Sequence, residues 1–413
     1  MRILLVHNLY GSAAPSGENS VVLEERDLLR SAGHEVMEHF TYSDTVRDHG
    51  VVALIRAGLS VPWNQRALRQ VRRLIVEFAP HVMHVHNVFP LLSPAVFAAA
   101  AGSGTAVVNT LHNYRPLCAN ALLLRRGTTC TECLDSRSVL PALRFGCYRG
   151  SGLATVPLAI SVALHRRLGT YHKHVDAFIV FTEFQKTLLA RAGFPERNIH
   201  VRPNCLPSST SHVPWDEREE KCVFIGRASP EKGLSSLIQA WALWGSAAPR
   251  LEVIGSGPEL EALTRDVPSA VADRISFLGA RPPQETQILL SRARLLIIPS
   301  TCYEAFPLVL RDALGHGVPV AASRLGALEE LIGPGSYGWL FAPGDPKDLQ
   351  RVVASLWRAP DELQRMSLAE RRAAETAYSP GLGSARLQSI YRLSIEHRQH
   401  VSPGRRELTS ENA

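Results

Sequence analysis

Short apolar runs alternate with longer amphipathic stretches along most of the chain. A short apolar run bounded by turn-forming residues predicts a buried parallel strand, and apolar positions spaced three and four apart predict a helix. The predicted strands cover residues 2–7, 34–42, 81–86, 106–111, 177–181, 199–201, 222–226, 251–254, 275–278, 295–298 and 337–341, with a further strand after Val318. Strands that alternate with helices in this way predict an α/β protein with parallel sheets.

The length of the chain indicates two domains. Its 413 residues exceed what one hydrophobic core usually serves. A stretch rich in serine, proline and charge at 206–220 is the predicted linker between domains 1–205 and 221–379. Helical patterns at 361–377 and 382–397 follow, and the mainly polar residues 401–413 are predicted to be a disordered tail.

Composition and charge narrow the function classes. The net charge of +7 favours acidic partners such as nucleotide phosphates or an anionic membrane surface, and no nucleic-acid recognition motif accompanies it. No stretch approaches the roughly 20 apolar residues of a membrane span, and Leu153 to Leu164 is expected to be a buried or interfacial helix. Because the first strand follows Met1-Arg2 directly, no signal peptide is expected, and a cytoplasmic location with reduced cysteines follows.

The loop after the first strand, residues 8–19, is rich in glycine and turn residues. It contains neither G-x-G-x-x-G nor G-x-x-x-x-G-K-[ST], which argues against a Rossmann dehydrogenase and a P-loop kinase. Gly17 is the candidate for close approach to a ligand, with an ordinary strand-to-helix turn as the alternative. Arg66, Arg69 and Arg73 share one face of a predicted helix, which is either a contact for anionic lipid or acceptor or simply a solvated face.

The stretch from Ser300 to Pro319 places acidic groups around a helix start. It follows the strand 295–298, and Pro307 suits a first helical turn. Backbone amides at a helix N-terminus attract anions, so those of Phe306, Leu308 and Val309 are a predicted anion seat. Glu304 and Asp312 flank this seat, and carboxylates accept hydrogen bonds from sugar hydroxyls. The stretch therefore suits a ligand that has both phosphate and sugar.

Four of the seven cysteines lie close together in the sequence. Cys118, Cys130, Cys133 and Cys147 have the spacing C-x11-C-x2-C-x13-C within a predicted insertion, 112–150. With reduced thiols this pattern predicts a structural zinc site without a catalytic role. Buried free thiols or two disulfides are the alternatives.

Several of these motifs resemble the signature of the retaining family 4 glycosyltransferases, the glycosyl transferases group 1. In that family an acidic residue, seven residues and a second acidic residue precede A-x-x-x-G-x-P, which matches Glu304, Asp312, Ala313, Gly317 and Pro319 here. G-R-x-x-x-x-K-G is matched from Gly226 to Gly233, and G-x-G-P from Gly255 to Pro258. Asp312 departs from the pattern, because the family usually has glutamate there.

The resemblance implies the GT-B architecture, in which two Rossmann-like domains face each other across a cleft. It implies that Arg227 and Lys232 neutralise the leaving diphosphate, that Asp312 contacts the ribose, and that the backbone near Ala280 reads the base. It also implies that Gly17 and Gly255 approach the donor, and that His112 faces the reacting sugar with His86 behind it. The last helix, 380–400, would cross back to the first domain.

The implied reaction moves a sugar from a nucleoside-diphosphate sugar to a hydroxyl acceptor with retention and without a catalytic metal. The acceptor would be a glycan, a lipid-linked molecule or a small molecule, in cell-surface polysaccharide or glycolipid assembly at the inner face of the plasma membrane. Two alternatives stay open. One is a GT-B epimerase or hydrolase, which would turn over donor without acceptor; the other is a non-catalytic sugar-nucleotide-binding protein.

Overall fold

The computed structural model describes residues 1–11, 16–44, 56–207, 213–333 and 338–401. The chain divides into two compact units. The first comprises Met1–Leu123, Thr131–Arg202 and the residues from Gly383 onward, and the second comprises Leu124–Cys130 and Pro203–Leu382. Both ends of the chain therefore belong to the first unit.

The first unit has a parallel sheet of six strands in the order β2-β1-β3-β4-β7-β8. The strands are β1 (Arg2–Leu9), β2 (Glu35–Tyr42), β3 (Val82–Val85), β4 (Ala106–Thr110), β7 (Ala177–Val180) and β8 (Ile199–Val201). The order reverses between β1 and β3. Side chains at the carboxyl ends of these two strands therefore border the crevice where open α/β sheets bind ligands.

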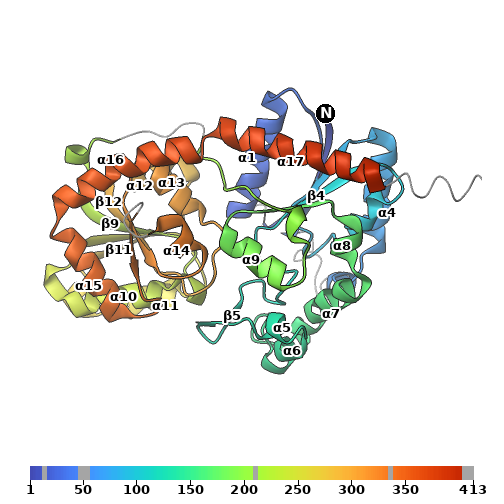
Figure 1. Ribbon diagram of the computed structural model, residues 1–413. Coiled ribbons are helices and arrows are strands. Elements are labelled where there is room, and N and C mark those ends of the chain that lie inside the picture. Colours follow the sequence, from blue (N-terminus) through green and yellow to red (C-terminus); the bar gives the residue numbers. More distant parts are fainter. Residues whose placement is uncertain (12–15, 45–55, 208–212, 334–337, 402–413) are drawn as a thin grey trace, which may run out of the picture. The chain divides into compact units, whose positions relative to one another are not determined.

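Helices cover the first sheet (Figure 1). One core cluster joins Ile3, Val108 and Ile179 of the sheet to Leu29 of α1 and Tyr391 of α17. The helices are α1 (Gly17–Ser31), α4 (Gln65–Phe78), α5 (Glu132–Asp135), α6 (Leu140–Phe145), α7 (Gly152–Leu168), α8 (Thr170–His174), α9 (Glu183–Arg191) and α17 (Pro380–Val401), with the 3-10 helices η1 (Pro94–Ala100) and η2 (Glu196–Asn198).

The second unit has a parallel six-stranded sheet in the order β11-β10-β9-β12-β13-β14, and the order reverses between β9 and β12. The strands are β9 (Glu219–Ile225), β10 (Arg250–Ile254), β11 (Ile275–Gly279), β12 (Ala293–Ile298), β13 (Val320–Ser323) and β14 (Gly338–Phe341). A separate antiparallel hairpin pairs β5 (Leu124–Arg125) with β6 (Thr128–Thr129).

Helices flank this second sheet on both faces (Figure 1). Trp241 of α10 and Val353 of α15 pack with Phe224 and Leu295 of the sheet in the main core cluster. The helices are α10 (Leu234–Trp244), α11 (Leu260–Arg265), α12 (Pro283–Ser291), α13 (Leu308–His316), α14 (Ala327–Ile332), α15 (Pro346–Trp357) and α16 (Pro360–Ala377), with the 3-10 helices η3 (Trp215–Glu217), η4 (Pro230–Lys232), η5 (Gly245–Ala247) and η6 (Ser269–Val271).

Helix α7 contains the apolar stretch that the sequence predicted to be a buried or interfacial helix, and the structure shows one buried side and one exposed side. Leu158 and Val162 are buried, whereas Leu153, Val156 and Ile160 are exposed by 87%, 39% and 49%. Within the described residues, no helix combines the length and apolar character needed to cross a membrane.

The predicted α/β class with two Rossmann-like parallel sheets is confirmed. The sequence placed the start of the second sheet slightly late, because β9 already begins at Glu219, inside the predicted linker. The cleft between the domains stays a prediction. Tyr337 and residues 402–413 of the predicted tail lie outside the described residues, whereas Val401, the first residue of that predicted tail, still belongs to helix 380–401.

Candidate active site

The signature residues of the second unit lie where its strand order reverses. Arg227 follows β9 and Glu304 follows β12, and these two strands are hydrogen-bonded neighbours. Lys232 ends η4 immediately before Gly233, which caps the start of α10. The topology therefore brings together two motifs that are about seventy residues apart in the chain.

Lys232 and Glu304 form the central contact of this site. Lys232 donates from Nζ to Oε1 of Glu304 at 2.6 Å, and Ser300 donates from Oγ to the same oxygen at 2.7 Å. Burial lowers the pKa of Lys232, but the neighbouring acidic groups, Glu304 foremost among them, together outweigh burial and raise the pKa above its usual value. Because of this raised pKa the lysine is cationic, and because its side chain is 30% exposed it is accessible to an anion. Arg227 is exposed on the same loop.

Two glycines in these motifs have a packing reason to be glycine. A Cβ on Gly233 would lie 1.9 Å from the carbonyl oxygen of Pro299, and one on Gly255 would lie 1.9 Å from that of Gly226. Their φ angles of +70° and +137° also disfavour other residues. The close approach required at Gly255 is thus to the neighbouring strand end, in addition to any approach to the predicted donor.

The predicted anion seat lies at the start of α13. Pro307 is the N-cap and Leu308 the first helical residue, so the sequence placed this start one residue early. Phe306 is buried with its ring edge-to-face against Tyr378, whereas Leu308 and Val309 are half-buried. The first amides of a helix have no acceptor within the helix, so the first turn of α13 suits an anion.

Asp312 lies in a hydrogen-bonded cluster that the sequence did not indicate. Gln287 of α12 donates to its Oδ2 at 2.7 Å, and Arg311 donates from Nε to its Oδ1 at 2.9 Å. Asp312 is 14% exposed, and Arg311 is almost fully buried. Each carboxylate oxygen can accept a second hydrogen bond, so contact with a ribose stays a prediction. Ala280, the predicted neighbour of the base, is exposed just after β11.

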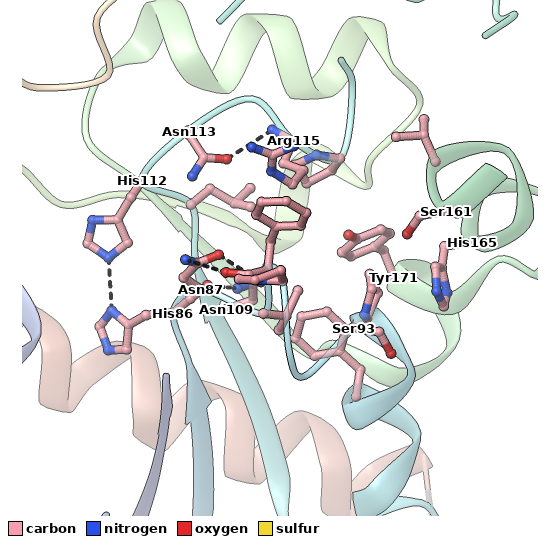
Figure 2. Close-up of a pocket in the computed structure, with 18 of the residues that line it drawn as sticks. His86, Asn87, Ser93, Asn109, His112, Asn113, Arg115, Ser161, His165 and Tyr171 are labelled. Carbon is pink, nitrogen blue, oxygen red and sulfur yellow. Dashed lines mark hydrogen bonds between the residues drawn. The ribbon is translucent and has the colours of Figure 1, made fainter. Parts of the chain in front are cut away.

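In the first unit, His112 and His86 lie together at the carboxyl ends of neighbouring strands. Nδ1 of His86 is 3.0 Å from Nε2 of His112, and the rings stack with centroids 5.3 Å apart (Figure 2). Burial and the positive charge that His86 and His7 would bear lower the pKa of His112 well below its usual value. Gly17 is the first residue of α1, after the N-cap Ser16.

A pocket of the first unit opens beside these histidines (Figure 2). Aromatic and apolar side chains form much of its wall, and polar groups line the rest. The lining includes Phe89, Phe97, Leu158, Val162 and Tyr171 together with His86, Asn87, Asn109, His112 and Arg115. The Arg115 guanidinium lies 4.1 Å from the centroid of the Phe89 ring. The pocket can hold an apolar group next to hydrogen-bonding partners, and hydrophobic periodicity did not predict it.

The four clustered cysteines are free thiols. Cys118 is buried and donates from Sγ to Asn120 Oδ1 at 3.0 Å, and burial raises its thiol pKa. Cys133 and Cys147 pack against one small apolar cluster with Val61 and Leu158. Among the described residues of the first unit, Cys118, Cys133 and Cys147 do not hold their sulfurs within reach of one metal ion. A zinc ion would have to draw them together, and its binding stays a prediction.

Two family models match most of the chain. Residues 16–205 match "Glycosyl transferase 4-like domain", and residues 219–359 match "Glycosyl transferases group 1". Among solved structures, sucrose-phosphate synthase from Thermosynechococcus elongatus has 16% identity, a TM-score of 0.69 and coverage of 95% of this chain and 98% of that one. Anabaena Alr3699/HepE in complex with UDP has 16% identity, a TM-score of 0.62 and coverage of 94% and 99%.

Curated relatives match over part of the chain. MMP alpha-(1->4)-mannosyltransferase of Mycolicibacterium hassiacum is 32% identical over 49% of this chain and 49% of its own length. D-inositol 3-phosphate glycosyltransferase of Segniliparus rotundus is 31% identical over 41% and 39%. The matches thus span half or less of these relatives' length.

The fold, the site at the reversal of the second sheet and these matches define a GT-B transferase. Residues 219–359 belong to the glycosyl transferases group 1 family, and residues 16–205 belong to the glycosyl transferase 4-like domain family.

Proposed function

We propose that the chain transfers a sugar from a nucleoside-diphosphate sugar to a hydroxyl acceptor with retention of anomeric configuration. The observation that supports this most directly is the Lys232–Glu304 pair beside Arg227 at the reversal of the second sheet. An accessible cation at a helix start suits the diphosphate of a donor, and the carboxylate beside it suits sugar hydroxyls. The structural neighbour HepE has been solved in complex with UDP and with UDP-glucose.

The proposed step breaks the bond between the anomeric carbon and the diphosphate oxygen. The acceptor hydroxyl oxygen forms the new bond from the same face, and its proton passes to the leaving phosphate. Arg227 and Lys232 stabilise the negative charge that develops on the leaving group, so the proposal needs no metal ion. Before the donor binds, Lys232 forms an ion pair with Glu304. When the donor binds, the diphosphate would replace Glu304 as the partner of Lys232.

We place the reaction in cell-surface polysaccharide or glycolipid assembly at the inner face of the plasma membrane. The exposed apolar positions of α7, with Arg166 and Arg167 in its last turn, support contact with an anionic membrane. The opposite face of α7 lines the pocket beside His112, which suits the acceptor side of the reaction.

A donor panel tests the proposal. UDP- and GDP-sugars are incubated with the full chain, with and without lipid or glycan extract, and release of nucleoside diphosphate and labelling of the extract are measured. We expect release that depends on the extract and labels it. Turnover without extract would favour the epimerase or hydrolase, and donor binding without turnover would favour the non-catalytic protein.

A further inference from the structure

A chain of buried polar side chains extends behind His112 into the first unit. His86 Nδ1 is 3.0 Å from His112 Nε2, and the other ring nitrogen of His86 is 3.3 Å from Oε1 of Glu25 on α1. Glu25 is 4% exposed, and His86 is equally buried. Nothing in the signature motifs assigns a role to Glu25.

The charge of Glu25 is fixed by its neighbours. Arg202 donates from Nη1 to Oε2 of Glu25 at 2.7 Å, and His84 Nδ1 is 3.0 Å from Oε1. Burial raises the pKa of Glu25, but Arg202 and His84 outweigh that effect and hold the pKa well below its usual value. Glu25 is therefore an ionised carboxylate, which can only accept hydrogen bonds.

An acceptor at one end of the chain determines every proton along it. A neutral imidazole has one N-H and one bare nitrogen. If His86 directs its Nε2-H to Glu25, its Nδ1 is bare and must accept from His112. His112 then has its proton on Nε2, and its Nδ1 is left as a hydrogen-bond acceptor.

We propose that Glu25 and His86 are positioning residues that hold His112 in the Nε2-H tautomer, so that its Nδ1 accepts a hydrogen bond from a sugar hydroxyl. This inference rests on the proposed function in so far as His112 meets the sugar. The tautomer itself is a property of the free protein.

The same atoms could instead suggest a metal site, because Glu25, His84 and His86 hold their ligand atoms within 4.8 Å of one another. The guanidinium of Arg202 already pairs with Oε2 of Glu25, and its positive charge would repel a metal cation bound to the same carboxylate. His84 is also engaged, with Tyr391 OH 2.7 Å from Nδ1 and Thr110 Oγ1 2.8 Å from Nε2. The charge of Arg202 and the hydrogen bonds of His84 therefore argue against a metal ion between these residues.

The test is to measure the tautomers directly. Full-length protein labelled with ¹⁵N in its histidine rings is examined by NMR without substrate, and His112→Gln and His86→Gln assign the signals. We expect Nε2-H for His86 and His112 in the wild type. A wild-type His112 with its proton on Nδ1 would overturn the proposal, as would a bound metal ion released by a chelator.

Glu25→Gln provides the perturbation. Arg202 holds the glutamine oxygen, so the glutamine NH₂ faces the histidines and should reverse the chain, with the His112 proton moved to Nδ1. Asp176→Asn is the matched control, because Asp176 is also buried and paired with Arg398 at 2.6 Å, yet it precedes β7 at the amino end of the strands. Unchanged His112 signals in Glu25→Gln would contradict the proposal.

Activity and its pH profile separate a positioning role from a structural one. The groups that face His112 are His7, His84, His86, Glu25 and, beyond them, Arg202 and Tyr391. We expect Glu25→Gln to lower kcat about tenfold or more and to alter its pH profile, with KM for the donor unchanged. Asp176→Asn should lose stability and keep the wild-type profile. Correct tautomers in a protein with no transferase activity would refute the proposed function and leave the tautomer assignment intact.

Discussion

At the scale of single residues, Lys232 and Arg227 are the two cations assigned to the donor diphosphate, and each can be removed separately. Lys232→Ala and Arg227→Ala should each lower kcat/KM by about ten- to a hundredfold, because one charge-assisted contact to phosphate is worth about 1.5–3 kcal/mol. Thermal stability should change far less. Arg351→Ala is the control, since it removes an arginine from an exposed ion pair with Asp348 on α15. Near-normal activity in both site variants would remove the diphosphate assignment.

Asp312 is the residue at which the chain departs from the family pattern. Gln287 and Arg311 each donate a hydrogen bond to one of its carboxylate oxygens. Asp312→Asn should weaken binding of the free nucleoside diphosphate, because an NH₂ group replaces an acceptor that faces a donor. Asp312→Glu should weaken the binding free energy of the nucleoside diphosphate by about 1–3 kcal/mol, because the longer side chain is strained if Gln287 limits the available space. Calorimetric titration of both variants and of Gln287→Ala distinguishes these effects. Equal affinity in wild type and both Asp312 variants would show that Asp312 does not touch the ribose.

Residue spacing indicated Lys232 and Glu304, which the structure brings into contact, because a family signature records both. Their roles in a donor site stay predictions. It could not predict Gln287 beside Asp312 or Glu25 beside His84. Those partners lie on other helices, and their contacts depend on how each helix is rotated on its sheet. The strands were easier to predict, because burial on both faces leaves a continuous apolar run.

At the scale of elements, the zinc prediction concerns the insertion from His112 to Gly150. Purified protein should contain about one zinc ion per chain, and Cys133→Ser should lose it and make this region sensitive to protease. Cys205→Ser, outside the insertion, is the control. Metal content is measured by mass spectrometry. A metal-free wild type with a protease-resistant insertion would favour buried thiols instead.

The second prediction at this scale is that helix α7 contacts the membrane. Replacing Leu153 and Ile160 together by serine should reduce sedimentation with anionic vesicles, because both expose apolar surface on the helix whose last turn contains Arg166 and Arg167. Leu243→Ser, at a position 56% exposed on α10, is the control for a general loss of apolar surface. Binding should also weaken as salt rises. If the double variant sediments like the wild type, α7 is not the membrane contact.

At the scale of the whole molecule, the buried histidines set the response to acid. Burial lowers the pKa of His7 to about 3 and that of His84 to about 4. Unfolding returns each pKa to about 6.5, so the unfolded chain binds more protons below that pH and the free energy of unfolding decreases. The contribution of Glu25, with its lowered pKa, is lost at still lower pH, as the pH falls below about 4.5 through the folded value.

Thermal unfolding of wild type and His7→Gln at about pH 7.5 and about pH 5 measures this effect. The wild type should lose more stability between the two conditions than His7→Gln, in which one buried histidine no longer titrates. His400→Gln, at an exposed position on α17, should behave like the wild type. A wild type as stable at pH 5 as at pH 7.5 would contradict the assignment.

The C-terminal helix α17 has a consequence for the order of events during synthesis. Leu387, Ile390 and Tyr391 complete the core of a unit whose sheet begins at Arg2. The ribosome therefore synthesises the second unit before it synthesises the last residues of the core of the first unit. Until then His84 lacks Tyr391, and the apolar face beneath α17 is open to chaperones. A nonsense mutation near the end of the gene would thus damage the unit encoded at its beginning.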